Sequence, residues 1–211
     1  MDRPRFPHRH SYMTRIATVI AMLLALCGWT LSAQAQDGTS NGNNALPQVR
    51  VSTSEGAFDI RLRPDIAPST VANFLSYVEQ GFYDGTVFHR VIPGFMIQGG
   101  GFDENLRQKA TDDPIELEAS QTARNLRGTI AMARTRNPNS ATSQFFINLG
   151  DNPHLNPSPS RPGYAVFGSI TQGMGVVDAI AGVETTRANG MSDVPADPVI
   201  IQSIQLVEDE Q

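Results

Sequence analysis

Short β-type runs separated by turn signals fill most of this chain, and they constrain its fold more than any other feature does. Residues 49–60 alternate apolar and polar side chains on either side of a Ser-Glu-Gly turn, which predicts a β-hairpin. Further β-type runs follow at residues 86–92, 95–98, 114–117, 129–133, 144–149, 164–170 and 199–207. About eight strands with few helices favour a mainly β domain, built as a closed antiparallel barrel or as a sandwich.

Two stretches have helical periodicity instead. Pro68 suits the first turn of a helix, and apolar residues then recur through residues 71–78 at the spacing of a core-facing helix, until Gly81 ends it. A second apolar stripe predicts a shorter helix over residues 175–181. We therefore expect one domain of short strands with two helices.

The segment of residues 1–35 has the composition of a secretory signal peptide. A basic stretch with four arginines precedes a short apolar run over residues 16–32, and the sequence AQA at 33–35 is a small-x-small cleavage pattern. A membrane anchor is one alternative, but a spanning helix needs about 20 apolar residues. Lipidation at Cys27 is another, although Leu26 stands where a small residue is expected.

Residues 36–47 are small and polar, which predicts a flexible linker to a single domain over residues 48–208. Cleavage after residue 35 removes the only cysteine and leaves twelve basic and twenty acidic residues. We therefore expect neither a disulfide nor nucleic acid as a partner. The mature protein should be a periplasmic or secreted monomer without a membrane span.

Reactive groups are scarce in the expected domain. Its two histidines, His89 and His154, do not belong to a cluster with metal-ligand spacing, and the sequence contains neither a nucleophile elbow nor a P-loop. Two long connections, residues 99–113 and 150–163, are polar or proline-rich, and such loops are often functional. The glycine run at 99–101 predicts a bend in the first of them rather than a phosphate cradle. We expect no metal ion and no cofactor.

One arginine stands out among apolar residues. In the segment FHRVIPGFMIQGG, residues 88–100, Arg90 and Gln98 lie in a hydrophobic setting, where a buried or half-buried cation needs partners. A structural salt bridge is one interpretation of Arg90, and a binding site is the other. Alternate residues of SQFFIN, at 143–148, point to opposite faces of a strand, so that one face can serve the core and the other a pocket.

These segments resemble the cyclophilin-type peptidyl-prolyl cis/trans isomerases. Residues 88–100 are similar to the family signature, SQFFI at 143–147 to a second block, and YAVFG at 164–168 to a third, in the family's order and at compatible spacings. The segment AMART at 131–135 is similar to the bacterial exported branch. The resemblance covers about residues 48–208, and it implies a closed eight-stranded antiparallel β-barrel capped by two α-helices.

The resemblance also implies where the site lies. The family's active face is an external groove, since side chains fill the interior of so small a barrel. Arg90 and Gln98 would be catalytic, and the substrate-binding residues would be Phe95, Met96, Ala133, Arg134, Gln144, Phe146, His154, Leu155 and Tyr164. Taken as residues alone, Phe95 and Phe146 also suit a core, Met96 a gap in it, and His154 an exposed loop.

The implied reaction is rotation about an Xaa-Pro bond, against a barrier of about 18–20 kcal/mol. The twisted prolyl nitrogen gains a lone pair, and a donor such as Arg90 that bonds this state better than the planar one lowers the barrier. Gln98 would bond the substrate backbone or orient Arg90. We expect the substrates to be Xaa-Pro segments of unfolded or partly folded exported proteins. The alternative is a proline-peptide binding module or holdase with little catalysis, which would not need Arg90.

Two positions depart from the pattern of the best-known eukaryotic members. Tyr164 stands where a histidine is common, and its hydroxyl can still donate a hydrogen bond. His154 stands where the family usually has tryptophan or another aromatic residue. The second departure predicts weaker binding of cyclosporin-type ligands.

Overall fold

The structure is a computed structural model that describes residues 46–207. The chain forms, in order, β1 (Gln48–Thr53), β2 (Gly56–Leu62), α1 (Pro68–Glu79), β3 (Thr86–Ile92), β4 (Met96–Asp103), β5 (Thr129–Met132), β6 (Phe145–Asn148), a 3₁₀-helix (Pro153–Leu155), β7 (Val166–Gln172), α2 (Met174–Ala181), β8 (Thr185–Ala188), β9 (Met191–Pro195) and β10 (Ile200–Leu206). The expected signal peptide, residues 1–35, and most of the expected linker lie outside the described residues. Within residues 46–207, no helix is long and apolar enough to cross a membrane.

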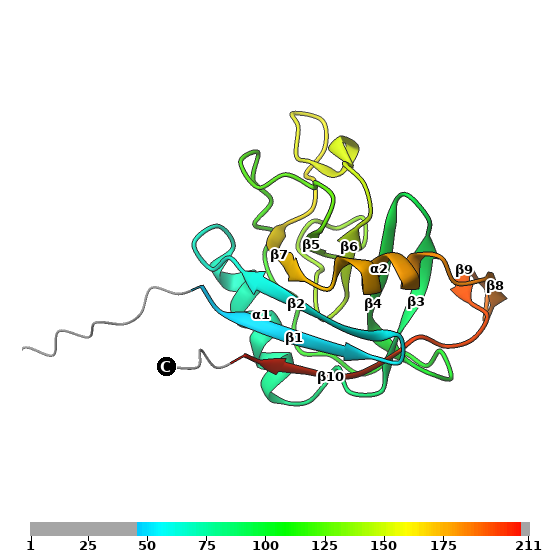
Figure 1. Cartoon of the computed structure of the whole chain (residues 1–211). Coiled ribbons are helices and arrows are strands. Elements are labelled where there is room, and N and C mark those ends of the chain that lie inside the picture. Colours follow the sequence, from blue (N-terminus) through cyan, green and yellow to red (C-terminus); the bar gives the residue numbers. More distant parts are fainter. Residues whose placement is uncertain (1–45, 208–211) are drawn as a thin grey trace, which may run out of the picture. The chain divides into compact units, whose positions relative to one another are not determined.

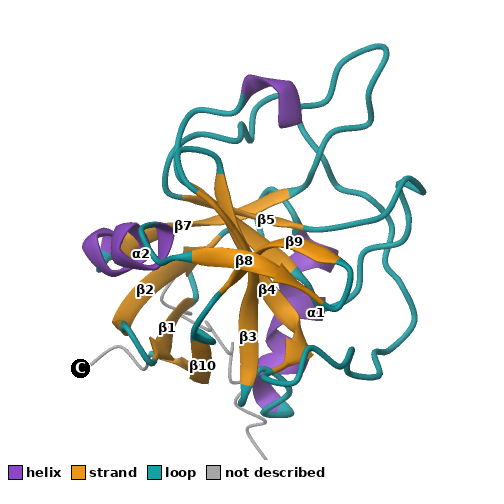
Figure 2. Cartoon of the chain, turned by 90° about the vertical axis from the view of Figure 1, so that its right-hand side faces the viewer, coloured by secondary structure: helices purple, strands orange, loops and turns teal. Residues whose placement is uncertain are grey.

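Eight strands close into an antiparallel barrel in the order β1-β10-β3-β4-β6-β5-β7-β2 (Figure 1). This confirms the fold that the resemblance implied and decides between the barrel and the sandwich. Strands β8 and β9 form a separate two-stranded sheet that packs against β3 (Figure 2). Helices α1 and α2 lie on opposite sides of the barrel in the same view.

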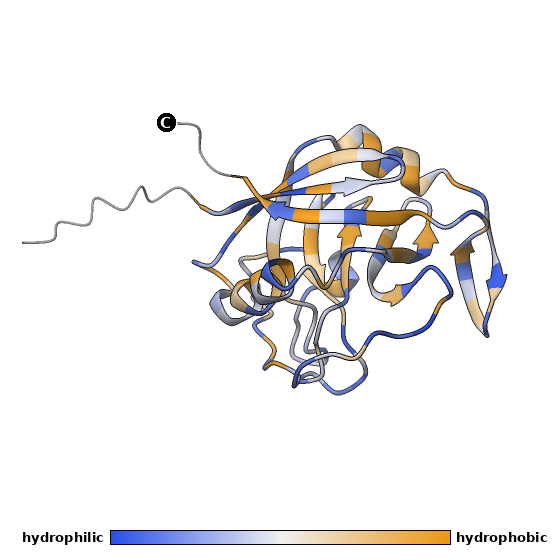
Figure 3. Cartoon of the chain, turned by 90° about the horizontal axis from the view of Figure 1, so that it is seen from below, coloured by the Kyte–Doolittle hydropathy of each residue, from blue (hydrophilic) through white to orange (hydrophobic). Residues whose placement is uncertain are grey.

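The alternation seen in the sequence of residues 49–60 sorts side chains between the two faces of the barrel wall. Val49 pairs with Ile60 and Val51 with Phe58 across the β1–β2 hairpin, and all four side chains are buried. Between them, Arg50 is exposed and Asp59 is buried against the Arg50 guanidinium, and hydrophilic and hydrophobic colours alternate along the strands in Figure 3. The alternation therefore fixes the register of the β1–β2 pair, because a slip of one residue would turn all of its buried apolar side chains to the outer face.

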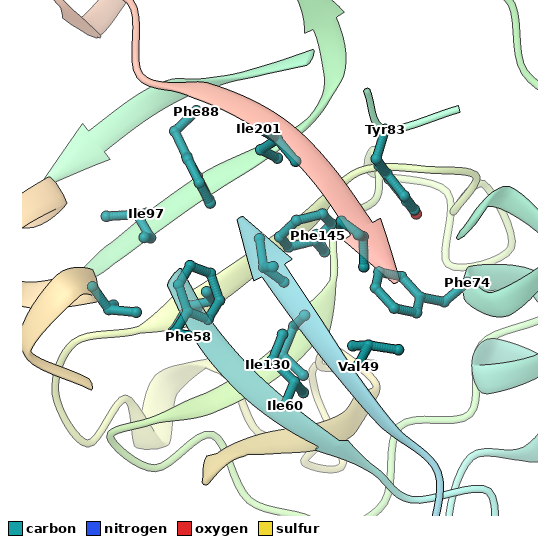
Figure 4. Close-up of a cluster of buried hydrophobic side chains, with 14 of the residues drawn as sticks. Val49, Phe58, Ile60, Phe74, Tyr83, Phe88, Ile97, Ile130, Phe145 and Ile201 are labelled. Atoms are coloured by element: carbon teal, nitrogen blue, oxygen red, sulfur yellow. The ribbon is translucent and has the colours of Figure 1, made fainter. Parts of the chain in front are cut away.

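Aromatic and aliphatic side chains together fill the interior of the barrel (Figure 4). Phe74 of α1 lies 5.2 Å from Tyr83, 5.8 Å from Phe145 and 5.2 Å from Phe167 between ring centroids. Val177 of α2 belongs to the same buried cluster. A filled interior leaves the outer face of the barrel for binding.

The start of α1 depends on a carboxylate from a distant part of the chain. Ala67, at the cap position, has no side chain that can accept a hydrogen bond. Glu118 accepts hydrogen bonds instead from the backbone N–H of Ser69 at 3.0 Å, and from the N–H and hydroxyl of Thr70 at 2.7 Å each. The connection between β4 and β5 is thereby fastened to the helix.

Two expectations about secondary structure were wrong, and one hairpin was missed. Residues 114–117 do not form a strand, because the only ladder pairing there is a single bridge between Ile115 and Ala141. The glycines at 99–101 do not form a loop bend but continue β4, where they allow close packing: a Cβ on Gly101 would lie 2.4 Å from Cγ of Gln144. The β8–β9 hairpin was missed, although Asn-Gly at 189–190 is a strong two-residue hairpin signal.

Candidate active site

A cavity of about 270 Å³ opens on the outer face of the barrel. It brings together nine of the predicted site residues: Arg90, Phe95, Met96, Gln98, Ala133, Arg134, Phe146, Leu155 and Tyr164. Two predicted residues, Gln144 and His154, are not among those that line it. The predicted residues, which span 75 positions of sequence from Arg90 to Tyr164, therefore meet mostly at one place.

Strand register sets the central row of the site. Arg90 of β3 pairs with Gln98 of β4, which pairs with Phe146 of β6, which pairs with Ala131 of β5. Paired residues on neighbouring strands point to the same face of a sheet. A cation, an amide and an aromatic ring are thus placed side by side across three strands.

The apolar wall of the pocket belongs to a small cluster of its own. Met96 and Phe146 are buried in this cluster, and Phe95, Leu155 and Tyr164 pack against it from the pocket side. None of these five residues belongs to the cluster that fills the barrel. They are therefore not part of the main core, which was the alternative interpretation of Phe95, Met96 and Phe146.

A buried amide network holds this wall in place. The side chain of Asn148 donates to the Asn125 side chain at 3.2 Å and to the Thr129 hydroxyl at 2.9 Å. Asn152 donates to Oδ1 of Asn148 at 2.8 Å and to the backbone carbonyl of Phe95 at 2.9 Å. Asn148 was expected on a strand, but the network was not foreseen, because the partners of Asn148 lie outside that strand.

Arg90 is more exposed than its apolar sequence context suggested, with 44% of its side chain accessible. It lies at an outward position of β3, and a little over half of its side chain is covered. Its Nε is 3.8 Å from Oδ2 of Asp193 on β9, whose side chain is 42% accessible. An exposed pair of this kind contributes about 0–1 kcal/mol, which argues against a purely structural role for the arginine.

Asp193 is a site residue that the sequence analysis missed. It has a positive φ of 62°, a backbone conformation that aspartate tolerates better than most residues. With Arg90 and Gln98 it lines a second, more open cavity next to the pocket. Its signal in the sequence was the unrecognised hairpin that carries it.

Gln98 donates a hydrogen bond from Nε2 to Oε1 of Gln144 at 2.9 Å. Gln144 therefore does not line the pocket but contacts a residue that does, Gln98. This bond fixes which end of the Gln98 amide faces Gln144 and leaves its carbonyl oxygen available as an acceptor. Among the hydrogen bonds of the described residues, none joins Gln98 to Arg90.

The two histidines of the domain differ in setting. His154 is exposed on the 3₁₀-helix and stacks on Phe95, with ring centroids 5.4 Å apart and planes 27° apart, so it extends the rim of the pocket. His89 is buried next to Arg90 in the sequence, and its Nδ1 has no hydrogen-bond partner. Burial, together with the charge of Arg90, lowers the pKa of His89 to about 4. It is therefore neutral at physiological pH.

The arrangement offers two guanidinium groups, those of Arg90 and Arg134, beside an apolar pocket, with amide groups along its edge. Residues 46–207 contain no group of three or more His, Cys, Asp or Glu side chains that could hold a metal ion. The site has the elements for binding a compact apolar ring and for donating hydrogen bonds to an atom next to it. Electrostatic stabilisation by such a preorganised donor needs no proton transfer.

Comparisons with known proteins agree with this geometry. The family model described as cyclophilin type peptidyl-prolyl cis-trans isomerase/CLD matches residues 48–206. The chain is 49% identical over 194 residues to a peptidyl-prolyl cis-trans isomerase of Acinetobacter baylyi, covering 92% of this chain and 96% of that protein. It is 52% identical over 163 residues to peptidyl-prolyl cis-trans isomerase B of Escherichia coli, covering 76% and 99%. A crystal structure of a cyclophilin type isomerase from Cryptosporidium parvum is similar with a TM-score of 0.66 and 27% identity, covering 78% of this chain and 99% of that one.

Proposed function

Because the chain belongs to the cyclophilin-type peptidyl-prolyl cis-trans isomerases, we propose that its isomerase activity resides in the pocket beside Arg90 and serves exported proteins. The family's substrates are proline-containing peptides. The observation that carries the proposal is the accessible guanidinium of Arg90 at the edge of a pocket of about 270 Å³ that Phe95, Met96, Phe146 and Leu155 line with apolar side chains.

The pocket would hold the proline ring as a fixed pivot. Met96 and Phe146 form its buried floor, while Phe95 and Leu155 close its sides. With the ring held, the rest of the peptide turns about the C–N bond, whose resonance sets the barrier of about 18–20 kcal/mol. No bond is broken, so no nucleophile or general base is required.

Arg90 would stabilise the twisted state. As resonance is lost, the prolyl nitrogen becomes pyramidal and accepts a hydrogen bond that the planar amide nitrogen does not accept. A donor that acts only on the twisted state lowers the barrier without tightening ground-state binding. One preorganised donor of this type contributes about 10²–10³-fold in kcat. The Gln98 carbonyl oxygen would accept a hydrogen bond from the substrate backbone and keep it in register.

Measurement of cis/trans exchange on an Xaa-Pro peptide tests this assignment. Arg90→Ala should lower kcat/KM by 10²-fold or more, and Arg90→Lys should restore only part of it, because lysine lacks the planar fork. Arg107→Ala is the matched control, since Arg107 is exposed and lies outside the pocket lining. A folded Arg90→Ala protein with near-normal exchange would overturn the role of Arg90. If the wild-type protein binds the peptide without accelerating exchange, the chain is a binding module or holdase instead.

The proposed service to exported proteins rests on the basic, apolar and AQA segments at the start of the chain. Mass spectrometry of the protein recovered from the host envelope should find a soluble form that begins at Gln36. A lipid-modified form that begins at Cys27 would refute cleavage at this site.

A further inference from the structure

Two arginines line the proline pocket, and their guanidinium groups are held in different ways. Arg90 has a single long contact, to Asp193. Arg134 donates from Nε to the backbone carbonyl of Gly163 at 3.0 Å, from Nη2 to the same carbonyl at 2.6 Å, and from Nη1 to the carbonyl of Thr135 at 2.8 Å. Three of its five N–H donors are thus used on backbone carbonyls before any substrate arrives.

The same guanidinium lies over the ring of Tyr164. Its central carbon is 4.5 Å from the ring centroid, within the range of a cation–π contact. The Tyr164 ring in turn meets Phe146 edge-on, with centroids 5.5 Å apart and planes at 85°. The Arg134 guanidinium, the Tyr164 ring and the Phe146 ring therefore form a continuous row of contacts that ends at the pocket floor.

Gly163 makes this row of contacts possible. Its φ is +72°, and a Cβ at this position would lie 2.4 Å from the backbone nitrogen of Pro157, so no side chain fits. The glycine lets the chain pass close to Pro157 while its carbonyl accepts both hydrogen bonds from Arg134. Arg134 thus binds the backbone immediately before Tyr164 through hydrogen bonds and contacts the Tyr164 ring as well.

We propose that Arg134 is a positioning residue: it holds the Tyr164 ring against Phe146 as one wall of the proline pocket, and its charge is not a contact for substrate. The inference rests on the proposed function of this pocket and assigns to Arg134 a role that differs from substrate binding. A wall that is already in place spares the cost of ordering it when the peptide binds. Loss of Arg134 should therefore act mainly on KM.

A double-mutant cycle tests whether Arg134 acts through Tyr164. Arg134→Ala alone should lower kcat/KM of peptide exchange about fivefold, mostly through KM. In a Tyr164→Ala background, the same change should cost less than twofold, because the ring that Arg134 holds is absent. Equal losses in the two backgrounds would overturn the inference. Arg136→Ala is the matched control, because Arg136 is exposed and does not line the pocket.

Substrate charge separates positioning from direct contact. With glutamate or lysine placed before the proline, the loss caused by Arg134→Ala should agree within twofold between the two peptides. A loss much larger for the glutamate peptide would show a direct charge contact and refute the proposal. If the pocket were not the isomerase site at all, Arg90→Ala and Tyr164→Ala would leave exchange unchanged, which is a different outcome from either of these.

Fluorine NMR of the protein labelled with 3-fluorotyrosine gives a readout without substrate. The Tyr164 signal, assigned from its absence in Tyr164→Phe, should shift or broaden in Arg134→Ala while the other tyrosine signals stay unchanged. Arg134→Lys keeps a cation near the ring but loses the fork, so its signal and KM should lie between wild type and Arg134→Ala. If Arg134→Ala does not fold, the Arg134→Lys protein still tests the positioning role. An unmoved Tyr164 signal in Arg134→Lys, with KM also unchanged, would refute the positioning role.

Discussion

Burial of His89 should make the stability of this protein depend on pH in the range from 7 to 4.5. The unfolded chain takes up a proton on this imidazole near the ordinary pKa of 6.5, whereas the folded protein takes it up only near pH 4. Between these values the proton binds the unfolded state alone, so acid favours unfolding. The free energy of unfolding should therefore be unaffected by His89 above pH 7 and should fall as the pH drops below it.

The size of the effect follows from the two pKa values. One pKa unit corresponds to 1.36 kcal/mol, so a shift from 6.5 to about 4 is worth about 3 kcal/mol in full and roughly 2.5 kcal/mol by pH 4.5. The group is 5% exposed, so solvent does little to reduce this difference. For a domain of this size, such a loss is a large part of the usual stability.

Urea titrations followed by circular dichroism at several pH values would measure this loss of unfolding free energy. His89→Phe keeps an aromatic ring against Phe102, whose centroid lies 4.6 Å from that of His89, and removes both the titration and the unpartnered Nδ1. The stability of wild type relative to His89→Phe should drop by roughly 2.5 kcal/mol between pH 7.5 and 4.5. His154→Gln, at an exposed histidine, is the control and should keep the wild-type profile. Parallel curves for wild type and His89→Phe would refute the reasoning.

Other predictions follow from the cap, the rim and the site chemistry. Glu118→Gln should lower the free energy of unfolding by about 1 kcal/mol at pH 7, measured in urea, because the carboxylate accepts the hydrogen bonds at the start of α1. Burial alone would raise the pKa of Glu118, but hydrogen bonds from Thr70 and Ser69 lower it. The stabilisation of α1 by this carboxylate is therefore present above the ordinary carboxyl pKa and is lost as the pH falls through the lowered pKa of Glu118. The kcat/KM of exchange should vary less than twofold between pH 6 and 8, since His89 is neutral there, and a bell-shaped profile would contradict a mechanism without a general base. His154→Trp should tighten cyclosporin inhibition tenfold or more in the exchange assay while changing kcat/KM less than threefold, because a larger flat side chain would extend the rim and not the pocket.

Local patterns predicted most of the fold. The alternation of residues 49–60 and the stripe at 71–78 each report on contacts with a single buried face, and the structure has a hairpin and a helix there. Such patterns succeed because a period of 2 or 3.6 is decided within one element. The strand prediction for residues 114–117 was wrong, since a β-type run becomes a strand only where a partner strand runs beside it.

The site was predictable only where its residues lie in recognisable segments. The segments at 88–100 and 143–147 carry most of the pocket, and the family resemblance indicated which of their residues share it. Asp193 and the hydrogen-bonded partners of Asn148 were not foreseen, because a hairpin signal near Asp193 does not say which strand the hairpin packs against, and the partners of Asn148 come from other segments.

Local patterns in the sequence were enough to predict a small β-rich domain, to place Arg90 within an apolar segment, and to separate the core face from the pocket face of SQFFIN. Only the folded chain shows that Arg90 is exposed beside Asp193 and that the Arg134 guanidinium contacts the Gly163 carbonyl and the Tyr164 ring. This difference arises because strand alternation and helical stripes are short-range properties. Exposure, hydrogen-bond partners and the packing of one ring on another depend on segments that only barrel closure brings together.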